Sequence, residues 1–179
     1  MKITIINGDD GKGKIRYFLS KYVDHLETEN EVILHNLREL EIQPCFGCCS
    51  CCYKTPGVCK IKDDQQAILK DFISSDVVII ISNLQVGFIN EKTKMFIDRL
   101  FPLELPYMEI KHGEYSHKLR YDHYPKIGFI LETEPDSDKE DLEINASINA
   151  DIGNFYGGFL FQRDINDSLE VLINETTSF

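Results

Sequence analysis

All six cysteines of the 179-residue chain lie within the fifteen residues from 45 to 59. Thiols that only filled a core would be spread over the elements that build it, whereas these alternate with Gly, Ser and Pro in a loop-like segment. Such a cluster is typical of a metal ligand set or of a dithiol pair that changes its redox state. The cluster therefore concentrates the distinctive chemistry of the chain in one place.

Four of these thiols, Cys45, Cys48, Cys51 and Cys59, follow the spacing C-x2-C-x2-C-x7-C. Four thiolates can bind zinc in a tetrahedron, although zinc sites more usually consist of two close pairs that lie farther apart. The same thiols can also form a disulfide switch or simply remain reduced. The residues alone leave these alternatives open.

The chain carries 19 basic and 30 acidic side chains, for a net charge of −11, and no basic block interrupts this acidity. We therefore expect no nucleic-acid partner. The first strand-like run is too short for a signal peptide, and no other stretch is long and apolar enough to cross a bilayer. We expect no membrane association and a cytoplasmic location, where thiols stay reduced.

Strand-like and helical segments alternate along the chain. Apolar and β-branched runs predict five strands, at residues 2–6, 31–35, 76–82, 126–131 and 158–162. Apolar residues at helical spacing predict helices over residues 14–29, 61–74, 90–100, 138–154 and 167–173. This order predicts an α/β fold, a doubly wound five-stranded parallel sheet in the flavodoxin-like order 2-1-3-4-5 with helices on both faces.

We expect a single domain over residues 1–179, with residues 102–125 as an insertion within it. The insertion is rich in tyrosine and histidine. Aromatic side chains favour interfaces, so we expect this segment to join two copies of the chain in a homo-oligomer, with a substrate lid as the alternative.

In a sheet of this order, ligands bind beyond the carboxyl ends of the strands, so residues 8–14, 82–88 and 132–135 should surround one crevice. Glycines in the first of these loops let backbone amides approach a phosphate at the start of a helix. The loop matches neither the Walker motif nor the dinucleotide fingerprint. An ordinary Gly-rich turn is therefore the alternative.

Several segments, taken in order, match the pattern of a known family, namely Ile3-Thr4-Ile5-Ile6-Asn7-Gly8, Lys54-Thr55-Pro56-Gly57-Val58-Cys59, Ser75-Asp76-Val77-Val78-Ile79, Gly87-Phe88, Ile97-Asp98-Arg99-Leu100 and His117-Lys118-Leu119-Arg120-Tyr121-Asp122. Through them the chain resembles the NADPH-dependent FMN reductase group of the flavodoxin-like superfamily, including its iron-sulfur flavoprotein branch. The resemblance runs from the first strand to about Glu143 and is weaker toward the C-terminus.

This resemblance implies an FMN-dependent oxidoreductase that takes electrons from NAD(P)H, or from a reduced protein, and passes them to a small acceptor such as a quinone or free flavin. The cofactor would carry the chemistry, so no catalytic acid or base is required. The four spaced thiols would be the ligands of a 4Fe-4S cluster. The implied FMN-contacting residues are Gly8, Asp9, Asp10, Lys12, Gly13, Lys14 and Ile15 for the phosphate and Ser82, Asn83, Leu84, Gln85, Val86, Gly87 and Phe88 for the ring.

Two departures from the family pattern bear on the flavin. Asp9 and Asp10 stand where the family usually has hydroxyl and guanidinium donors, and they would repel a phosphate unless Lys12 and Lys14 compensate. Asn83 replaces a proline in the second loop. The alternative to the reductase is therefore a degenerate electron carrier or metal-binding protein that keeps the fold without turnover.

Overall fold

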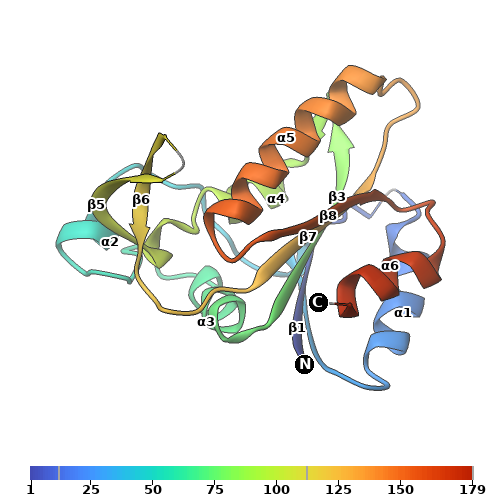
Figure 1. Ribbon diagram of the computed structural model, residues 1–179, viewed down its shortest axis with the longest axis horizontal. Helices are drawn as coiled ribbons and strands as arrows, with labels where there is room; N and C mark the ends of the chain where they lie inside the picture. Colours follow the sequence, from blue (N-terminus) through green and yellow to red (C-terminus); the bar gives the residue numbers. More distant parts are fainter. Residues whose placement is uncertain (12, 112, 179) are drawn as a thin grey trace.

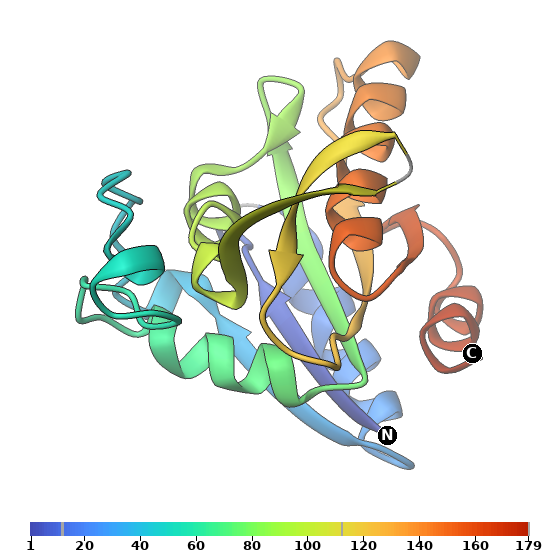
Figure 2. The ribbon, with the colours of Figure 1, turned by 60° about the vertical axis from the view of Figure 1, so that its left-hand side comes forward.

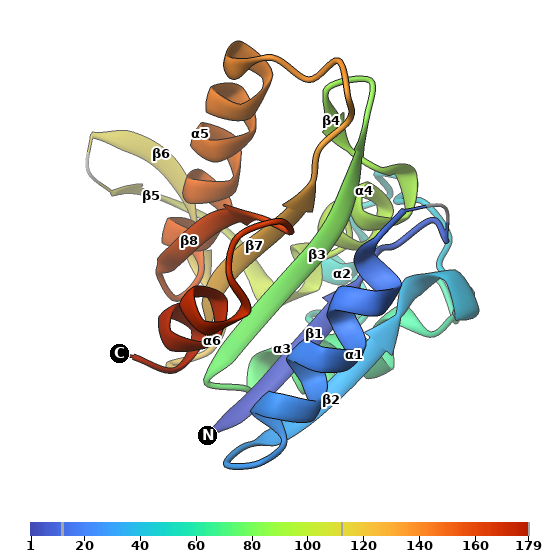
Figure 3. The ribbon, with the colours of Figure 1, turned by 90° about the vertical axis from the view of Figure 1, so that its right-hand side faces the viewer.

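A computed structural model describes residues 1–11, 13–111 and 113–178. Its centre is a parallel sheet (Figure 1) with the strand order β2-β1-β3-β7-β8 (Figure 3), which confirms the predicted order. The middle strand, β3, carries the run Val77 to Ile81 and is buried on both faces, as expected for the most apolar segment. The five parallel strands are β1 (Lys2–Asn7), β2 (Glu31–Asn36), β3 (Val77–Gln85), β7 (Lys126–Glu132) and β8 (Phe159–Asp164).

Helices cover both faces of this sheet. Helices α1 (Ile15–Leu26) and α6 (Leu169–Thr177) lie in front of it in Figure 3. On this face, Leu19 of α1 and Leu172 of α6 are buried in one cluster with residues of β1, β3 and β8. The other face is covered by α3 (Gln65–Ser74), α4 (Glu91–Ile97) and α5 (Lys139–Phe155). The two apolar clusters hold the loops at the carboxyl ends of the strands in fixed positions. No helix in the described part of the chain is long and apolar enough to cross a membrane.

Several elements were not predicted. A short strand, β4 (Phe88–Ile89), pairs antiparallel with the end of β3 and makes the sheet six-stranded. The insertion forms a separate antiparallel hairpin of β5 (Glu104–Lys111) and β6 (Glu114–Leu119), which stands apart from the sheet in Figure 1 and comes to the front in Figure 2. The remaining additions are the single-turn elements η1 (Leu37–Glu39), α2 (Ser50–Tyr53) and η2 (Phe101–Leu103).

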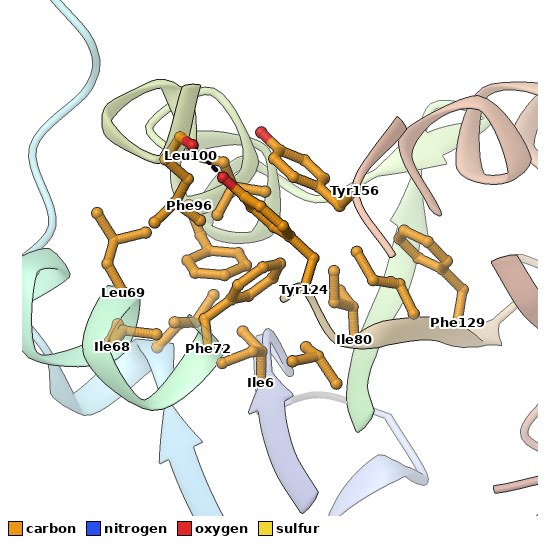
Figure 4. Close-up of a cluster of buried hydrophobic side chains, with 14 of the residues drawn as sticks. Ile6, Ile68, Leu69, Phe72, Ile80, Phe96, Leu100, Tyr124, Phe129 and Tyr156 are labelled. Atoms are coloured by element: carbon orange, nitrogen blue, oxygen red, sulfur yellow. Dashed lines mark hydrogen bonds between the residues drawn. The ribbon is translucent and has the colours of Figure 1, made fainter. Parts of the chain in front are cut away.

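Two tyrosines join the hairpin to the core. The rings of Tyr124 and Tyr156 stack with their centroids 5.8 Å apart, above the buried aromatic and aliphatic side chains of the α3–α4 face (Figure 4). The Tyr156 hydroxyl donates to Glu104 Oε1 at 2.8 Å. Burial raises the pKa of the Glu104 carboxyl, and the hydrogen bond from Tyr156 and the nearby His117 offset this only in part. The base of the hairpin is thus packed, while its far end is exposed.

Candidate functional site

A crevice opens beyond the carboxyl ends of β1, β3 and β7. It encloses a cavity of about 390 Å³, and each of the three loops expected to meet there contributes to its lining. The side of the crevice nearest α1 is made by Asp10 and Gly13. The opposite sides are made by residues 83–85 of β3 and residues 132–135 after β7.

The first loop is folded around its own carboxylate. Asp9 is 6% exposed, and its Oδ1 accepts the Gly11 amide at 2.8 Å, while its own amide donates to Asn7 Oδ1 at 3.1 Å. Asp9 thus stabilises the turn by accepting a backbone amide within its own loop. Lys12, one of the residues expected to compensate this charge, lies outside the described residues.

The N-terminus of α1 is bound by a carboxylate from a distant strand. The Lys14 amide donates to Glu132 Oε1 at 2.7 Å, and the helix has no side-chain cap of its own. A Cβ atom at Gly13 would lie only 1.9 Å from Glu132 Oε2, so the glycine leaves a cradle that this carboxylate fills. Free helix amides and the helix dipole favour negative charge there. The cradle therefore suits an anionic oxygen, and its residues fit the phosphate of a flavin nucleotide.

Asn90 ties the loops of the crevice together. It is 3% exposed and caps α4 by accepting the Thr93 amide at 3.0 Å. Its Nδ2 donates to the Gly8 carbonyl at 2.5 Å and to Asn83 Oδ1 at 2.7 Å. Asn83 Oδ1 in turn accepts the Asp10 amide at 3.3 Å. Sequence reasoning missed this role, although an Asn directly before a helix is a recognisable N-cap signal.

The residues expected to contact the flavin are distributed unevenly. Those that line the cavity are Asp10, Gly13, Asn83, Leu84 and Gln85. Ser82 and Ile15 are fully buried in the sheet and helix packing. Gly8 carries the carbonyl that Asn90 holds, and Phe88 pairs with Gln85 in β4. The flavin contacts themselves stay a prediction.

A two-residue turn joins β3 to β4 at the rim of the crevice. Val86 and Gly87 have φ values of 54° and 73°, and Val86 is 97% exposed. The turn is fixed from below, because the Gly87 amide donates to Glu134 Oε2 at 3.3 Å and its carbonyl accepts from Asn145 Nδ2 at 2.7 Å. The rim is therefore held rigidly over the opening, with an exposed valine at its tip.

The cysteine loop forms a second cavity, of about 260 Å³, with mostly apolar walls. Cys45, Cys48, Cys51 and Cys59 all line it, as does Cys49. Cys52 is 7% exposed, is buried in the base of α2 and does not line this cavity. The four thiols in the predicted ligand spacing therefore share one cavity wall.

The thiols of this cavity differ in acidity. Burial, followed by the neighbouring thiols of Cys52 and Cys59, raises the pKa of Cys51 to about 12. Hydrogen bonds from Ser50 lower the pKa of the exposed Cys48 thiol. Within the described residues, no group of three or more Cys, His, Asp or Glu side chains is already arranged around a metal position. The donor set thus has the chemistry that a cluster needs, while its thiols would have to converge to bind one.

Arg99 clamps the cysteine loop to the core. Its guanidinium is 1% exposed and pairs with both carboxylate oxygens of Asp63, one of them Oδ1 at 2.9 Å. It also donates to the Gln43 carbonyl at 2.9 Å and to Cys59 Sγ at 3.5 Å. Because Gln43 precedes the cysteines and Asp63 follows them, one side chain fixes both ends of the loop.

Helix α4 connects the two cavities. Its N-cap, Asn90, holds the loops of the crevice, and its C-cap, Asp98, lines the thiol cavity. Seven helical residues span about 10 Å at 1.5 Å per residue. The two cavities share no lining residue, so they are separate sites at opposite ends of one rigid element.

Comparison with known proteins shows that the chain is similar to flavoproteins. A curated relative, an iron-sulfur flavoprotein of Methanocaldococcus jannaschii, is 36% identical over 107 residues, which cover 59% of this chain and 54% of the relative. The chain thus spans about half the length of the curated relative that it matches.

Solved structures share the fold. The azoreductase AzrA superposes with a TM-score of 0.66 at 13% identity, over 100% of both chains. An FMN-dependent NADH-azoreductase from Bacillus anthracis, solved with FMN, superposes with a TM-score of 0.59 at 17% identity, over 98% of this chain and 93% of that one. The sequence model of the NADPH-dependent FMN reductase family matches residues 1–119. Because the match covers more than half of the chain, from β1 through two of the three crevice loops and the cysteine loop to β6, the chain belongs to the NADPH-dependent FMN reductase family.

Proposed function

We propose that the protein is an FMN-dependent oxidoreductase that takes electrons from NAD(P)H and passes them to a small acceptor. The observation that carries this proposal is the crevice at the carboxyl ends of β1, β3 and β7, where the cradle at Gly13 and the Lys14 amide hold a carboxylate oxygen. This is where a doubly wound sheet binds its ligand, and the chain belongs to a family of FMN reductases.

The chain's own residues would bind and orient the cofactor. The Lys14 amide and the space beside Gly13 at the start of α1 would receive the phosphate, and Asn83, Leu84 and Gln85 would border the ring. When bound, FMN supplies hydride and electron transfer, and the protein contributes position and electrostatics. Asn90 keeps the loops of the crevice at a fixed separation, so both ends of the cofactor would meet a preformed surface.

An anaerobic mixing experiment tests this function. The protein is mixed with FMN and then with NADPH or NADH, and the visible flavin band is followed in time. We expect bleaching at a rate proportional to protein concentration, and loss of that rate in Gly13→Val, whose side chain would fill the cradle. A rate no faster than that of FMN and the nicotinamide without protein would refute the proposal. Circular dichroism of the variant shows whether it folds.

A second proposal concerns the cysteine loop, which we assign as the ligand set of a 4Fe-4S cluster. It is supported by the four thiols on one cavity wall and by the iron-sulfur flavoprotein among the relatives. Anaerobic purification followed by iron and acid-labile sulfide assays tests it. Cys48→Ala should lose both, whereas Cys52→Ala, outside the cavity, should retain them. Zinc without sulfide, or neither metal, would overturn the assignment.

We also infer that two copies of the chain associate through the β5–β6 hairpin. The support is that its far end leaves large apolar side chains exposed, namely Tyr107, Met108, Ile110 and Tyr115. Ile110→Glu should convert a dimer to a monomer in sedimentation experiments, and a natural chain that is monomeric at all concentrations would contradict the inference. A cytoplasmic location would suit the six unpaired cysteines.

A further inference from the structure

Glu132 occupies the place in the crevice that a flavin phosphate would take. It ends β7, and its side chain reaches the N-terminus of α1, where Oε1 accepts the Lys14 amide at 2.7 Å. Its Oε2 lies within 1.9 Å of the position of a Cβ atom on Gly13. A carboxylate from the same chain thus fills the cradle at Gly13 and the helix N-terminus, a position suited to an anion.

We propose that Glu132 is a built-in competitor of the flavin phosphate, so that FMN binds only when this side chain has moved away. The inference rests on the proposed function, because it concerns the same crevice. FMN would then be a ligand that binds and dissociates, rather than a permanently held group.

The charges around the cradle support competition rather than joint occupancy. A phosphate monoester carries nearly two negative charges near pH 7, and its repulsion by a carboxylate in the same cradle opposes joint occupancy. Two more carboxylates, those of Asp10 and Glu134, line the same cavity. Asp9 is already committed to the Gly11 amide inside the first loop. Glu132 is therefore the acidic residue that competes with the phosphate for the cradle. The repulsion of the phosphate expected from Asp9 and Asp10 is secondary to this competition.

The contacts of Glu132 also show why it can be displaced. One of its oxygens is hydrogen-bonded, but Oε2 is buried and has no donor within the described part of the chain. A buried carboxylate oxygen without a donor is costly, so this side chain is held by one good bond and opposed by desolvation. A phosphate offers more oxygens to the same amides. The cradle can therefore exchange one anion for the other.

This competition should distinguish two flavins that differ only in the phosphate. Riboflavin has the same ring system as FMN but no phosphate, so Glu132 does not need to leave the cradle when riboflavin binds. Removing the charge of Glu132 should therefore strengthen the binding of FMN and leave that of riboflavin unchanged.

The test is equilibrium titration of both flavins by fluorescence quenching, with the natural chain, Glu132→Gln and Glu140→Gln. Glutamine keeps an oxygen for the Lys14 amide, so the start of α1 stays capped in Glu132→Gln. Glu140→Gln removes the same charge from an exposed site in the first turn of α5 and controls for net charge. We expect the FMN dissociation constant to fall about tenfold or more in Glu132→Gln, which corresponds to about 1.4 kcal/mol.

Each outcome bears on the proposal. Tighter FMN binding in Glu132→Gln, with unchanged riboflavin binding and no change in Glu140→Gln, supports it. Equal FMN dissociation constants in the natural chain and Glu132→Gln would overturn it while leaving the proposed function intact. Equal gains for FMN and riboflavin would also overturn it, because the effect would not depend on the phosphate. If none of the three proteins bound either flavin, both the inference and the proposed function would fail.

Discussion

The buried pair of Arg99 and Asp63 shows how one residue can position a whole functional segment. Arg99 satisfies Asp63, the Gln43 carbonyl and the Cys59 thiol at once, so its loss would free the cysteine loop at both ends. Burial alone would raise the pKa of the Asp63 carboxyl, but the hydrogen bonds from Arg99 and from backbone amides outweigh burial and hold that pKa below its usual value.

The lowered pKa of Asp63 gives the protein an acid-sensitive element. A carboxyl whose pKa is lower in the folded than in the unfolded state stabilises the fold at pH values above its unfolded-state pKa, which is about 3.9 for Asp. That contribution is lost as the pH falls through the folded pKa. Urea unfolding of Asp63→Asn should therefore show a loss of about 3–5 kcal/mol at neutral pH and a shallower decline below about pH 4.

The exposed ion pair of Lys139 and Glu143 on α5 provides the control for this measurement. Glu143→Gln should change the free energy of unfolding by about 0.5 kcal/mol or less, because solvent screens exposed pairs. An Asp63→Asn protein as stable as Glu143→Gln would show that the Arg99 clamp contributes nothing.

The six thiols should differ in reactivity in the metal-free protein. The thiolate is the reactive form, and the pKa is lowered at the exposed Cys48 and raised to about 12 at Cys51. Brief treatment with iodoacetamide near neutral pH should therefore modify Cys48 well before Cys51, as measured by peptide mass spectrometry. Labelling in urea is the control, because unfolding should remove the difference. Modification of Cys51 first would contradict these environments.

At this scale the sequence predicted much, but not the contacts between distant segments. The clustering and spacing of the thiols were readable because they are local in the chain. Glu132 was expected near the crevice only as part of a loop, and its bond to Lys14 spans 118 positions. A side chain that caps a helix from another strand leaves no local pattern, so only the fold could reveal it.

Among the elements, the turn between β3 and β4 carries backbone strain at the rim of the crevice. Both of its central residues have positive φ, the geometry of a tight hairpin turn that favours Asn and Gly. A β-branched residue such as Val86 is poorly suited to this conformation.

Replacing Val86 should therefore stabilise the protein. We expect Val86→Asn to raise the free energy of unfolding by about 1 kcal/mol, since Asn adopts positive φ more readily. Urea denaturation measures this directly. Val58→Asn changes an exposed valine outside the positive-φ region and should show no such gain. A Val86→Asn protein less stable than the natural chain would show that the valine makes favourable contacts at the turn.

Some of the helices and strands could be predicted from the sequence, and others could not. The strands of the parallel sheet were predicted because buried strands form continuous apolar runs, as in Val77 to Ile81. The β5–β6 hairpin was not predicted, because its exposed residues follow no clean alternation and its pairing is irregular between Glu104 and Met108. The one-turn α2 depends on the fold of the cysteine loop rather than on periodicity.

The molecule as a whole is strongly acidic, and its proposed ligands are anions. The net charge of −11 and the carboxylates of the crevice should slow the approach of FMN. Raising the ionic strength from about 0.01 M to about 0.15 M shortens the screening length from about 30 Å to about 8 Å. The association rate of FMN in stopped-flow fluorescence should rise with salt, while that of uncharged riboflavin stays constant. A rate for FMN that falls with salt would indicate a local attractive field instead.

The central claim is that the crevice at the carboxyl ends of β1, β3 and β7 binds a flavin. The most direct measurement is the visible spectrum of the anaerobically purified protein, followed by titration with FMN. We expect flavin bands that the protein either retains on purification or acquires by saturable, one-to-one binding of FMN. A nicotinamide donor should bleach these bands. A colourless protein that binds no FMN at any concentration would contradict the account and leave only the fold.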